Sequence, residues 1–433
     1  MHTRPDVRLA SAAVGLALLL SSTPAFTQAG PQNQHWVATW ATALVPRPSQ
    51  PPPSAAAAAP GGQGAPAQAP QAPPRFSNQT LRQIVHTSIG GQRVRVVLSN
   101  TFGTASLPIG AARVGLRQKD SALVAGSAQP LTFSGRAAIS IPAGAVMVSD
   151  PVSLAVPPLS DLAIDVYLPD DTGATPSPLT SHNGALQTSY VSVAGDHTGA
   201  MAFPVMSTTT SWFFLARVEV IAPTQVGAVA AIGDSITDGS RSTPDTNNRW
   251  PDHLARALNQ NGRAMGVLNL GIAGNRVLSD GNGPSALARF DRDILVPPGV
   301  THVIFMEGIN DLGRMVSAED VIAGHTQIIE RAHARGLKII GATITPIEDT
   351  TFAGYYTPAN EAARQAVNQW IRTSKAYDGV IDFDALLRDA SRPTKLQLPY
   401  ASSDYIHPND AGYRAMAAAV NLELFGIRQA DRR

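Results

Sequence analysis

Two short segments that lie far apart in the chain carry the side chains of a candidate nucleophilic site. The tetrapeptide Gly-Asp-Ser-Ile at 233–236 follows an apolar run over 226–232, while Asp404 and His407 lie three residues apart near the other end. Serine is a poor nucleophile until a neutral imidazole accepts its proton and a carboxylate orients that imidazole. Ser235, His407 and Asp404 are therefore candidates for a Ser-His-Asp triad.

Two further blocks follow short apolar stretches, in the manner of a loop after a strand. The first is Asn-Leu-Gly-Ile-Ala-Gly-Asn at 269–275, and the second is Gly-Ile-Asn-Asp at 308–311. Together the four blocks resemble the SGNH (or GDSL) hydrolase superfamily, whose name lists a serine, a glycine, an asparagine and a histidine from such segments. In this chain the four residues are Ser235, Gly274, Asn310 and His407.

The resemblance implies a role for each of these residues. Ser235 would be the nucleophile, His407 the general base and Asp404 the acid that orients it. The oxyanion hole would consist of the backbone N–H groups of Ser235 and Gly274 and the side-chain amide of Asn310, because donors fixed where negative charge develops stabilise the transition state. No metal or cofactor is predicted. The neighbouring residues that we expect to support the loops are Asp234, Asn275 and Asp311.

The order of the regions is similar to that of exported two-domain arylesterase and acylhydrolase members of the superfamily, which open with a β-rich module and a Trp-x-x-x-Trp motif, here Trp36 and Trp40. This implies a serine esterase that removes a short acyl group, in particular acetyl, from a small-molecule or glycan ester. Two alternatives stay open: a lysophospholipase or lipase-like acylhydrolase on longer chains, and a glycan-binding protein with a vestigial hydrolase domain. The oligomeric state is not predicted.

Composition narrows the class of protein further. With 33 basic and 32 acidic residues the net charge is +1, so a nucleic-acid partner is not expected. The absence of cysteine excludes disulfides, thiolate metal sites and a cysteine nucleophile. Arg314 either lines the pocket or begins a helix, and the tryptophans are interpreted mainly as core residues. Histidines without metal-ligand spacing are interpreted as solvated or packed: His86, His182, His197, His253, His302, His325 and His333.

The N-terminus is typical of an export signal. Arg4 and Arg8 precede an apolar segment over 9–20, and small residues continue to Ala29, so we predict a signal peptide over 1–29. Export to the periplasm or beyond would follow, with no stable membrane insertion after cleavage; an uncleaved anchor helix is the alternative. A second segment, 46–74, is rich in proline and alanine and is predicted to be a disordered insertion within a domain, or else a plain spacer.

A chain of 433 residues is too long for one compact core, and two folded domains are predicted. Over 80–222 the sequence alternates apolar and polar residues in short runs, for example at 93–98, 162–168 and 213–220, without a convincing helix. Together with a strand expected at 36–40, this pattern predicts an antiparallel β-sandwich domain of jelly-roll type over 30–222.

Over 223–433 strands and helices alternate, which predicts an α/β domain with a flavodoxin-like parallel sheet, the SGNH hydrolase domain. Strands are expected at 227–232, 265–269, 302–306, 338–343 and 380–383, and helices at 250–261, 318–335, 358–376 and 410–424. Thr357 and Ser317 are expected to cap the helices that follow them. Ser235, Gly274 and Asn310 then fall in loops after strands, where open α/β sheets bind ligands.

Overall fold

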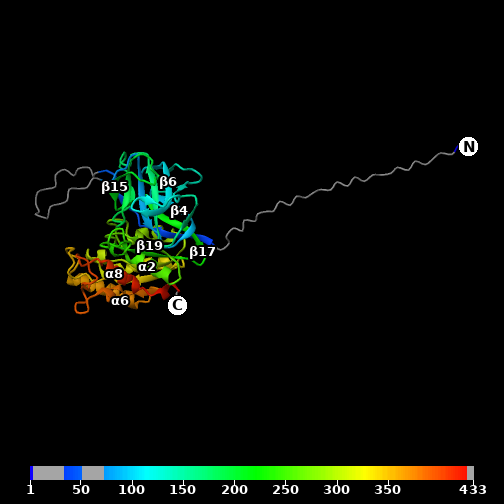
Figure 1. Cartoon of the computed structure of the whole chain (residues 1–433). Coiled ribbons are helices and arrows are strands. Elements are labelled where there is room, and N and C mark those ends of the chain that lie inside the picture. The colour runs from blue at the N-terminus through cyan, green and yellow to red at the C-terminus, as the bar shows by residue number, and fades with distance from the viewer. Residues whose placement is uncertain (3–33, 51–72, 427–433) are drawn as a thin grey trace, which may run out of the picture. The chain divides into compact units, whose positions relative to one another are not determined.

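The computed structural model describes residues 1–2, 34–50 and 73–426 (Figure 1). From Gln34 onward the described residues form one compact unit. The predicted signal peptide, and most of the insertion predicted over 46–74, lie outside the described residues. Pro46 and Arg47 were assigned to that insertion, and this was wrong, because both belong to a strand that pairs with residues 179–181. None of the helices in the described ranges is long and apolar enough to cross a bilayer.

Up to Pro223 the described residues form antiparallel sheets without a helix. In the first sheet the strands run in the order β1 (Gln34–Ala41), β17 (Leu215–Pro223), β4 (Gly91–Ser99) and β10 (Val146–Val148). A fifth strand, β11 (Val152–Val156), also pairs with β4. In the second sheet the order is β15 (Val205–Thr209), β14 (Ser189–Ala194), β3 (Gln79–His86), β12 (Asp161–Leu168), β6 (Ala111–Lys119) and β7 (Ala122–Leu123). A further strand, β8 (Gln129–Leu131), also pairs with β6. The smaller pairings are β16 (Trp212–Phe213) with β13 (Leu179–His182) and β2 (Val45–Arg47), and β5 (Leu107–Ile109) with β9 (Ile139–Ile141).

The two larger sheets share one apolar core, which makes this region sandwich-like. Alternate residues of β4 and β17, such as Val94 and Val218, are buried in the same cluster as Leu81 of β3 and Ile164 of β12. This alternation is what a strand with one face on a core requires. A jelly-roll order of the strands stays a prediction.

The second half of the chain contains the parallel sheet, in the order β19 (Gly266–Gly271), β18 (Ala228–Gly233), β20 (Val300–Met306), β21 (Lys338–Ala342) and β22 (Gly379–Ile381). Numbered along the chain this order is 2-1-3-4-5, which is that of flavodoxin-like sheets. Every residue of β18 is buried, as expected of a strand covered on both faces.

Helices cover both faces of this sheet. On one face lie α2 (Trp250–Gln260), α7 (Phe383–Leu387), α8 (Asp410–Ala418) and the 3₁₀ helix η2 (Leu422–Phe425). On the other lie α3 (Ala286–Phe290), the π-helical turn η1 (Asp291–Leu295), α4 (Ile309–Leu312), α5 (Ala318–His333) and α6 (Pro358–Thr373). A short α1 (Ser235–Asp238) follows β18. Ser317 and Thr357 cap α5 and α6 through their hydroxyl oxygens, as predicted.

Strand β1 joins the two regions of the core. Val37 packs into the sandwich, whereas Ala38, on the opposite face of the strand, packs into the core of the parallel sheet. A Cβ on Gly266 would lie 2.3 Å from the carbonyl oxygen of Ala38, so the backbone of β1 approaches β19 closely where β19 has no side chain. The first strand of the described chain therefore stabilises the α/β region as well as the sandwich.

Three element predictions need correction. The strand expected over 213–220 is divided at Phe214, whose φ of +58° turns the chain from β16 into β17. The buried Phe214 stays in this costly conformation because its N–H donates to Thr180 O and its carbonyl accepts from Ser99 N, each at 2.8 Å. Phe383 begins α7 instead of ending β22, and the last predicted helix stops at Ala418.

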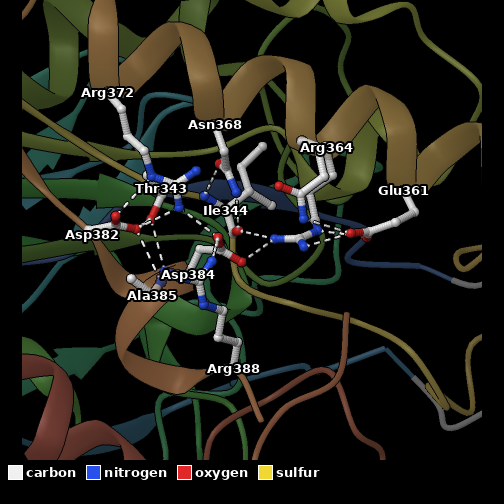
Figure 2. Close-up of polar contacts among 11 residues, drawn as sticks. Thr343, Ile344, Glu361, Arg364, Asn368, Arg372, Asp382, Asp384, Ala385 and Arg388 are labelled. Carbon is white, nitrogen blue, oxygen red and sulfur yellow. Dashed lines mark hydrogen bonds and ion pairs between the residues drawn. The ribbon is translucent and has the colours of Figure 1, made fainter. Parts of the chain in front are cut away.

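A buried network of ion pairs fastens α6 to the carboxyl end of the sheet (Figure 2). The guanidinium of Arg364 makes two hydrogen bonds of 2.8 Å to Glu361 and one of 2.6 Å to Asp384. The same group donates to the carbonyl of Ile344 at 2.7 Å, and Arg372 reaches the second oxygen of Asp384 at 2.6 Å. The loop that follows β21 and contains Ile344 is thus held against α6.

Replacing Arg364 by alanine should lower the free energy of unfolding by about 3–5 kcal/mol, because the fully buried Asp384 would lose a partner. Urea unfolding followed by tryptophan fluorescence measures this change. The matched control is Arg388→Ala, since Arg388 also faces Asp384, but at 3.7 Å and with 43% of its side chain exposed. That pair should contribute at most about 1 kcal/mol. Equal losses in the two variants would contradict the network's proposed contribution.

Candidate active site

The strands that precede Ser235, Gly274 and Asn310 end at the same edge of the parallel sheet. Gly233, at the end of β18, lies in register with Gly271 of β19 and with Met306 of β20. Because the carboxyl ends of neighbouring parallel strands meet at one edge, the three loops that follow are adjacent. Ser235 begins α1, Gly274 lies in the loop after β19, and Asn310 lies in α4 after β20.

In the structure His407 lies within hydrogen-bond distance of both Ser235 and Asp404. His407 Nε2 lies 2.8 Å from Ser235 Oγ, and His407 Nδ1 lies 2.9 Å from Asp404 Oδ2. A carboxylate accepts, so Nδ1 carries the proton and Nε2 is left to accept from the serine hydroxyl. This is the tautomer that general-base activation of a serine requires.

Asp404 accepts from five donors, which keep it ionised. Its Oδ2 accepts from His407 Nδ1 and from Arg241 Nε, the latter at 2.7 Å, while Oδ1 accepts from Ser402 Oγ and the backbone N–H groups of Ile406 and His407. Burial by itself raises the pKa of Asp404, but the hydrogen bonds from His407 and Ser402 outweigh it and hold that pKa far below the usual range. The sequence did not indicate Arg241, because nothing in its surroundings marks it as a partner of a residue 163 positions away.

The turn that presents Ser235 depends on close backbone approach. A Cβ on Gly233 would lie 2.1 Å from Thr237 Oγ1 and 2.8 Å from Met306 O, so glycine is required there by space. Asp234 caps α1 by accepting from Ile236 N at 2.8 Å, and burial raises the pKa of Asp234 to about 6. The N–H of Ser235 opens the helix, where backbone donors have no acceptor within the helix.

The predicted oxyanion donors are held by specific contacts. Gly274 has a φ of +75°, a conformation that favours glycine. Asn310 Nδ2 donates one hydrogen to Asn275 O at 2.9 Å, and Asn310 Oδ1 accepts from the Tyr355 hydroxyl at 3.0 Å. The Asn275 carbonyl, which can only accept, therefore fixes which end of the amide is the donor. The second Nδ2 hydrogen of Asn310 makes no hydrogen bond to the described residues and can donate to an oxyanion.

Tyr355 belongs to a loop over 345–357 that the sequence did not connect with the site. Arg314, which was expected either to line the pocket or to begin a helix, donates from Nη1 to the Tyr355 hydroxyl at 3.0 Å and to Asn310 O at 3.2 Å. Phe352 lies edge-on to His407, with ring centroids 6.0 Å apart, and is 42% exposed. The loop thus places an exposed aromatic ring beside the candidate general base.

The residues expected to support the loops make contacts of that kind. Asp311 accepts from the backbone N–H groups of Val277 and Leu278 at 2.9 and 3.2 Å, and burial raises its pKa. Asn275 Oδ1 accepts from Arg289, a fully buried arginine that also bonds to the carbonyl of Gly233. Arg289 lies 3.4 Å from Glu307, whose pKa is raised well above its usual value by burial.

Comparison with known families agrees with this geometry. Residues 231–415 match the model of the GDSL-like Lipase/Acylhydrolase family. This segment contains every residue of the predicted triad and oxyanion hole. It is a domain of that family, and the protein is accordingly a hydrolase that acts on esters. No curated protein matches the chain in sequence.

Several solved structures align with about half of this chain. A GDSL-like lipase from Bacteroides thetaiotaomicron is 19% identical over 46% of this chain and 88% of its own, with a TM-score of 0.36. A member of the lipolytic G-D-S-L family from Veillonella parvula is 21% identical over 46% of this chain and 99% of its own, also with a TM-score of 0.36. A mutant acetyl-xylooligosaccharide esterase from a Geobacillus species is 22% identical over 47% of this chain and 98% of its own, with a TM-score of 0.36.

Proposed function

We propose that the protein is an exported serine esterase that hydrolyses short acyl esters, in particular acetyl esters, of a carbohydrate. The observation that carries the proposal is the chain of hydrogen bonds from Ser235 Oγ through His407 to Asp404, with distances of 2.8 and 2.9 Å. An assembled triad argues against a vestigial hydrolase domain. Export rests on the sequence of residues 1–29, which lie almost entirely outside the described part of the chain.

In the proposed mechanism Ser235 Oγ attacks the ester carbonyl carbon while its proton passes to His407 Nε2. The carbonyl oxygen becomes an oxyanion that accepts from the N–H groups of Ser235 and Gly274 and from Asn310 Nδ2. When the tetrahedral intermediate collapses, the alcohol leaves with the proton from His407 and the acyl group stays on Ser235. Water then repeats the cycle and releases the acid, with Asp404 ionised throughout.

Two features support a carbohydrate as the alcohol. The exposed ring of Phe352 lies on the His407 side of the site, from which the leaving alcohol takes its proton, and an aromatic face is suited to pack on a sugar ring. The resemblance of the overall layout to exported two-domain esterases points in the same direction. Phe352 also offers apolar area to a longer acyl chain, so chain length is the property to measure.

Rates on aryl esters from acetate to decanoate test the proposed chain length. We expect kcat/KM to be highest for acetate and to fall steadily with each added pair of methylenes. A maximum at octanoate or decanoate would instead support the lipase-like alternative. The same active site should release acetate from acetylated oligosaccharides. A fluorophosphonate should label this site at Ser235. Label on another residue would contradict the assignment.

A further inference from the structure

One histidine of the sandwich reaches the catalytic domain beside the nucleophile. His182, the last residue of β13, is 3% exposed, and its Nε2 lies 3.1 Å from Asp238 Oδ1. Its Nδ1 lies 2.8 Å from the carbonyl oxygen of Ala43. Asp238 is the last residue of α1, the helix that Ser235 begins. His182 was interpreted from sequence as solvated or packed, and the structure shows that it is buried and bonded across to α1.

The second oxygen of Asp238 continues the connection to the loop of Gly274. Asp238 Oδ2 accepts from the backbone N–H of Ala273 at 3.1 Å. The carbonyl of the same Ala273 accepts from Asn282 Nδ2 at 2.9 Å. That carbonyl belongs to the planar peptide unit whose N–H is the predicted oxyanion donor of Gly274. The direction in which this donor points is therefore set from both sides of Ala273.

Both ring nitrogens of His182 face acceptor oxygens, so a replacement must supply two donors to make the same bonds. Nδ1 faces a carbonyl, which only accepts, so Nδ1 must donate. Nε2 faces a carboxylate oxygen, so a proton must lie between Nε2 and Asp238 Oδ1. Among the described residues His182 is the only side chain that bonds to this oxygen. Without it, the buried Asp238 would keep one oxygen unpaired and would lose the orientation in which it accepts from Ala273.

The sandwich residues just after His182 hold the neighbouring catalytic loop as well. Thr188 donates from its N–H and its hydroxyl to Asp245, each at 2.6 Å, and Gln187 donates to the same carboxylate at 2.7 Å. Asp245 lies in the loop that carries Arg241, the residue that donates to Asp404. The sandwich thus contacts both α1, which Ser235 begins, and the loop that carries Arg241.

We propose that His182 is a positioning residue, through which the β-sandwich domain holds the Gly274 loop in the geometry needed for oxyanion binding. This inference rests on the proposed function, in which Gly274 donates to the oxyanion. It assigns the sandwich a part in catalysis, because an active site without His182 would have Ser235 and His407 in place but a misdirected donor.

A pair of amide substitutions separates the two bonds of His182. In His182→Gln the amide nitrogen lies near the position of Nε2 and can donate to Asp238, whereas in His182→Asn it lies near Nδ1 and can reach only Ala43 O. We expect H182Q to keep kcat for an aryl acetate within about threefold. H182N should lower kcat by about 10- to 100-fold with KM changed by less than about threefold, the cost of a donor misplaced by roughly an ångström.

The matched control is His86→Gln, which breaks another histidine–aspartate pair of the sandwich, because His86 bonds to Asp161 through Nδ1 at 2.7 Å and the Gln amide nitrogen would lie near Nε2 instead. It should leave kcat unchanged. Should H182N fail to fold, His182→Phe keeps the ring beside Trp212 and removes both hydrogen bonds, and the same loss of kcat is expected.

Three results would overturn the inference: wild-type kcat in folded H182N or H182F, an equal loss of kcat in H182Q, or an equal loss in H86Q. Ser235→Ala in the same assay keeps the two proposals apart. Turnover by S235A would refute the function, whereas an inactive S235A with a fully active H182N would refute only the role of His182.

Discussion

Replacement of Ser235 by alanine is expected to lower kcat for an aryl acetate by roughly 10⁴- to 10⁶-fold. The hydroxyl that attacks the carbonyl is lost, while His407, Asp404 and the oxyanion donors remain. Stopped or continuous assays of phenolate release measure the loss, provided that a trace of wild-type enzyme is excluded. The fold should be retained, because the substitution removes one hydrogen bond, of 2.8 Å, whose contribution to stability is about 1 kcal/mol.

The control for this experiment is Ser242→Ala. Ser242 is also buried, lies in the loop that follows α1, and makes no side-chain hydrogen bond to the described residues. S242A should therefore keep the wild-type rate. If S235A retained more than about one hundredth of the rate while S242A was fully active, a general hydroxide or another nucleophile would have to carry the reaction, and the acyl-enzyme mechanism would be wrong.

The α/β half of the fold was predictable because its signals are local. Each of its five strands is an apolar run followed by a loop. Ser317 and Thr357 are capping residues that indicate where α5 and α6 begin. The failures concern interactions that sequence does not display. Phe214 breaks a strand because the chain changes sheets there, and the alternation of apolar residues continues across the break. Strand β1 packs on two cores because Gly266 leaves space for it, a property of the assembled structure.

The same distinction applies to the candidate site. Ser235, Gly274, Asn310, Asp404 and His407 lie in short blocks that can be compared with a family, and the structure brings the triad members together. Arg241, Tyr355 and His182 lie outside such blocks. Each reaches the site from a loop or strand whose path depends on long-range packing, and each is of a residue type that occurs on any protein surface. Only contacts in three dimensions could indicate them.

Asparagine in place of Asp404 is expected to lower kcat by roughly 10⁴-fold, because an amide cannot hold the required tautomer of His407. If the amide nitrogen faces His407, Nδ1 becomes the acceptor, and Nε2 then carries a proton and cannot take another from Ser235. The same nitrogen would also confront Arg241 Nε, which lies 2.7 Å from Oδ2 in the native protein. The flipped amide would place its nitrogen against the N–H groups of Ile406 and His407, which now donate to Oδ1. Neither orientation satisfies the five donors.

The structural cost of D404N must be separated from its catalytic cost, and Asp410→Asn is the matched substitution. Asp410 also accepts from the loop after α1, from Thr243 N at 2.8 Å and Asn248 Nδ2 at 3.0 Å, but its hydrogen bonds within the described part of the chain do not include His407. D410N should keep kcat within severalfold, even if its melting temperature falls as much as that of D404N. Comparable losses of kcat in the two variants would mean that the carboxylates act only by holding the loop. A selective loss in D404N would mean that Asp404 acts on His407 itself, by holding its tautomer and by stabilising the imidazolium formed when Ser235 attacks.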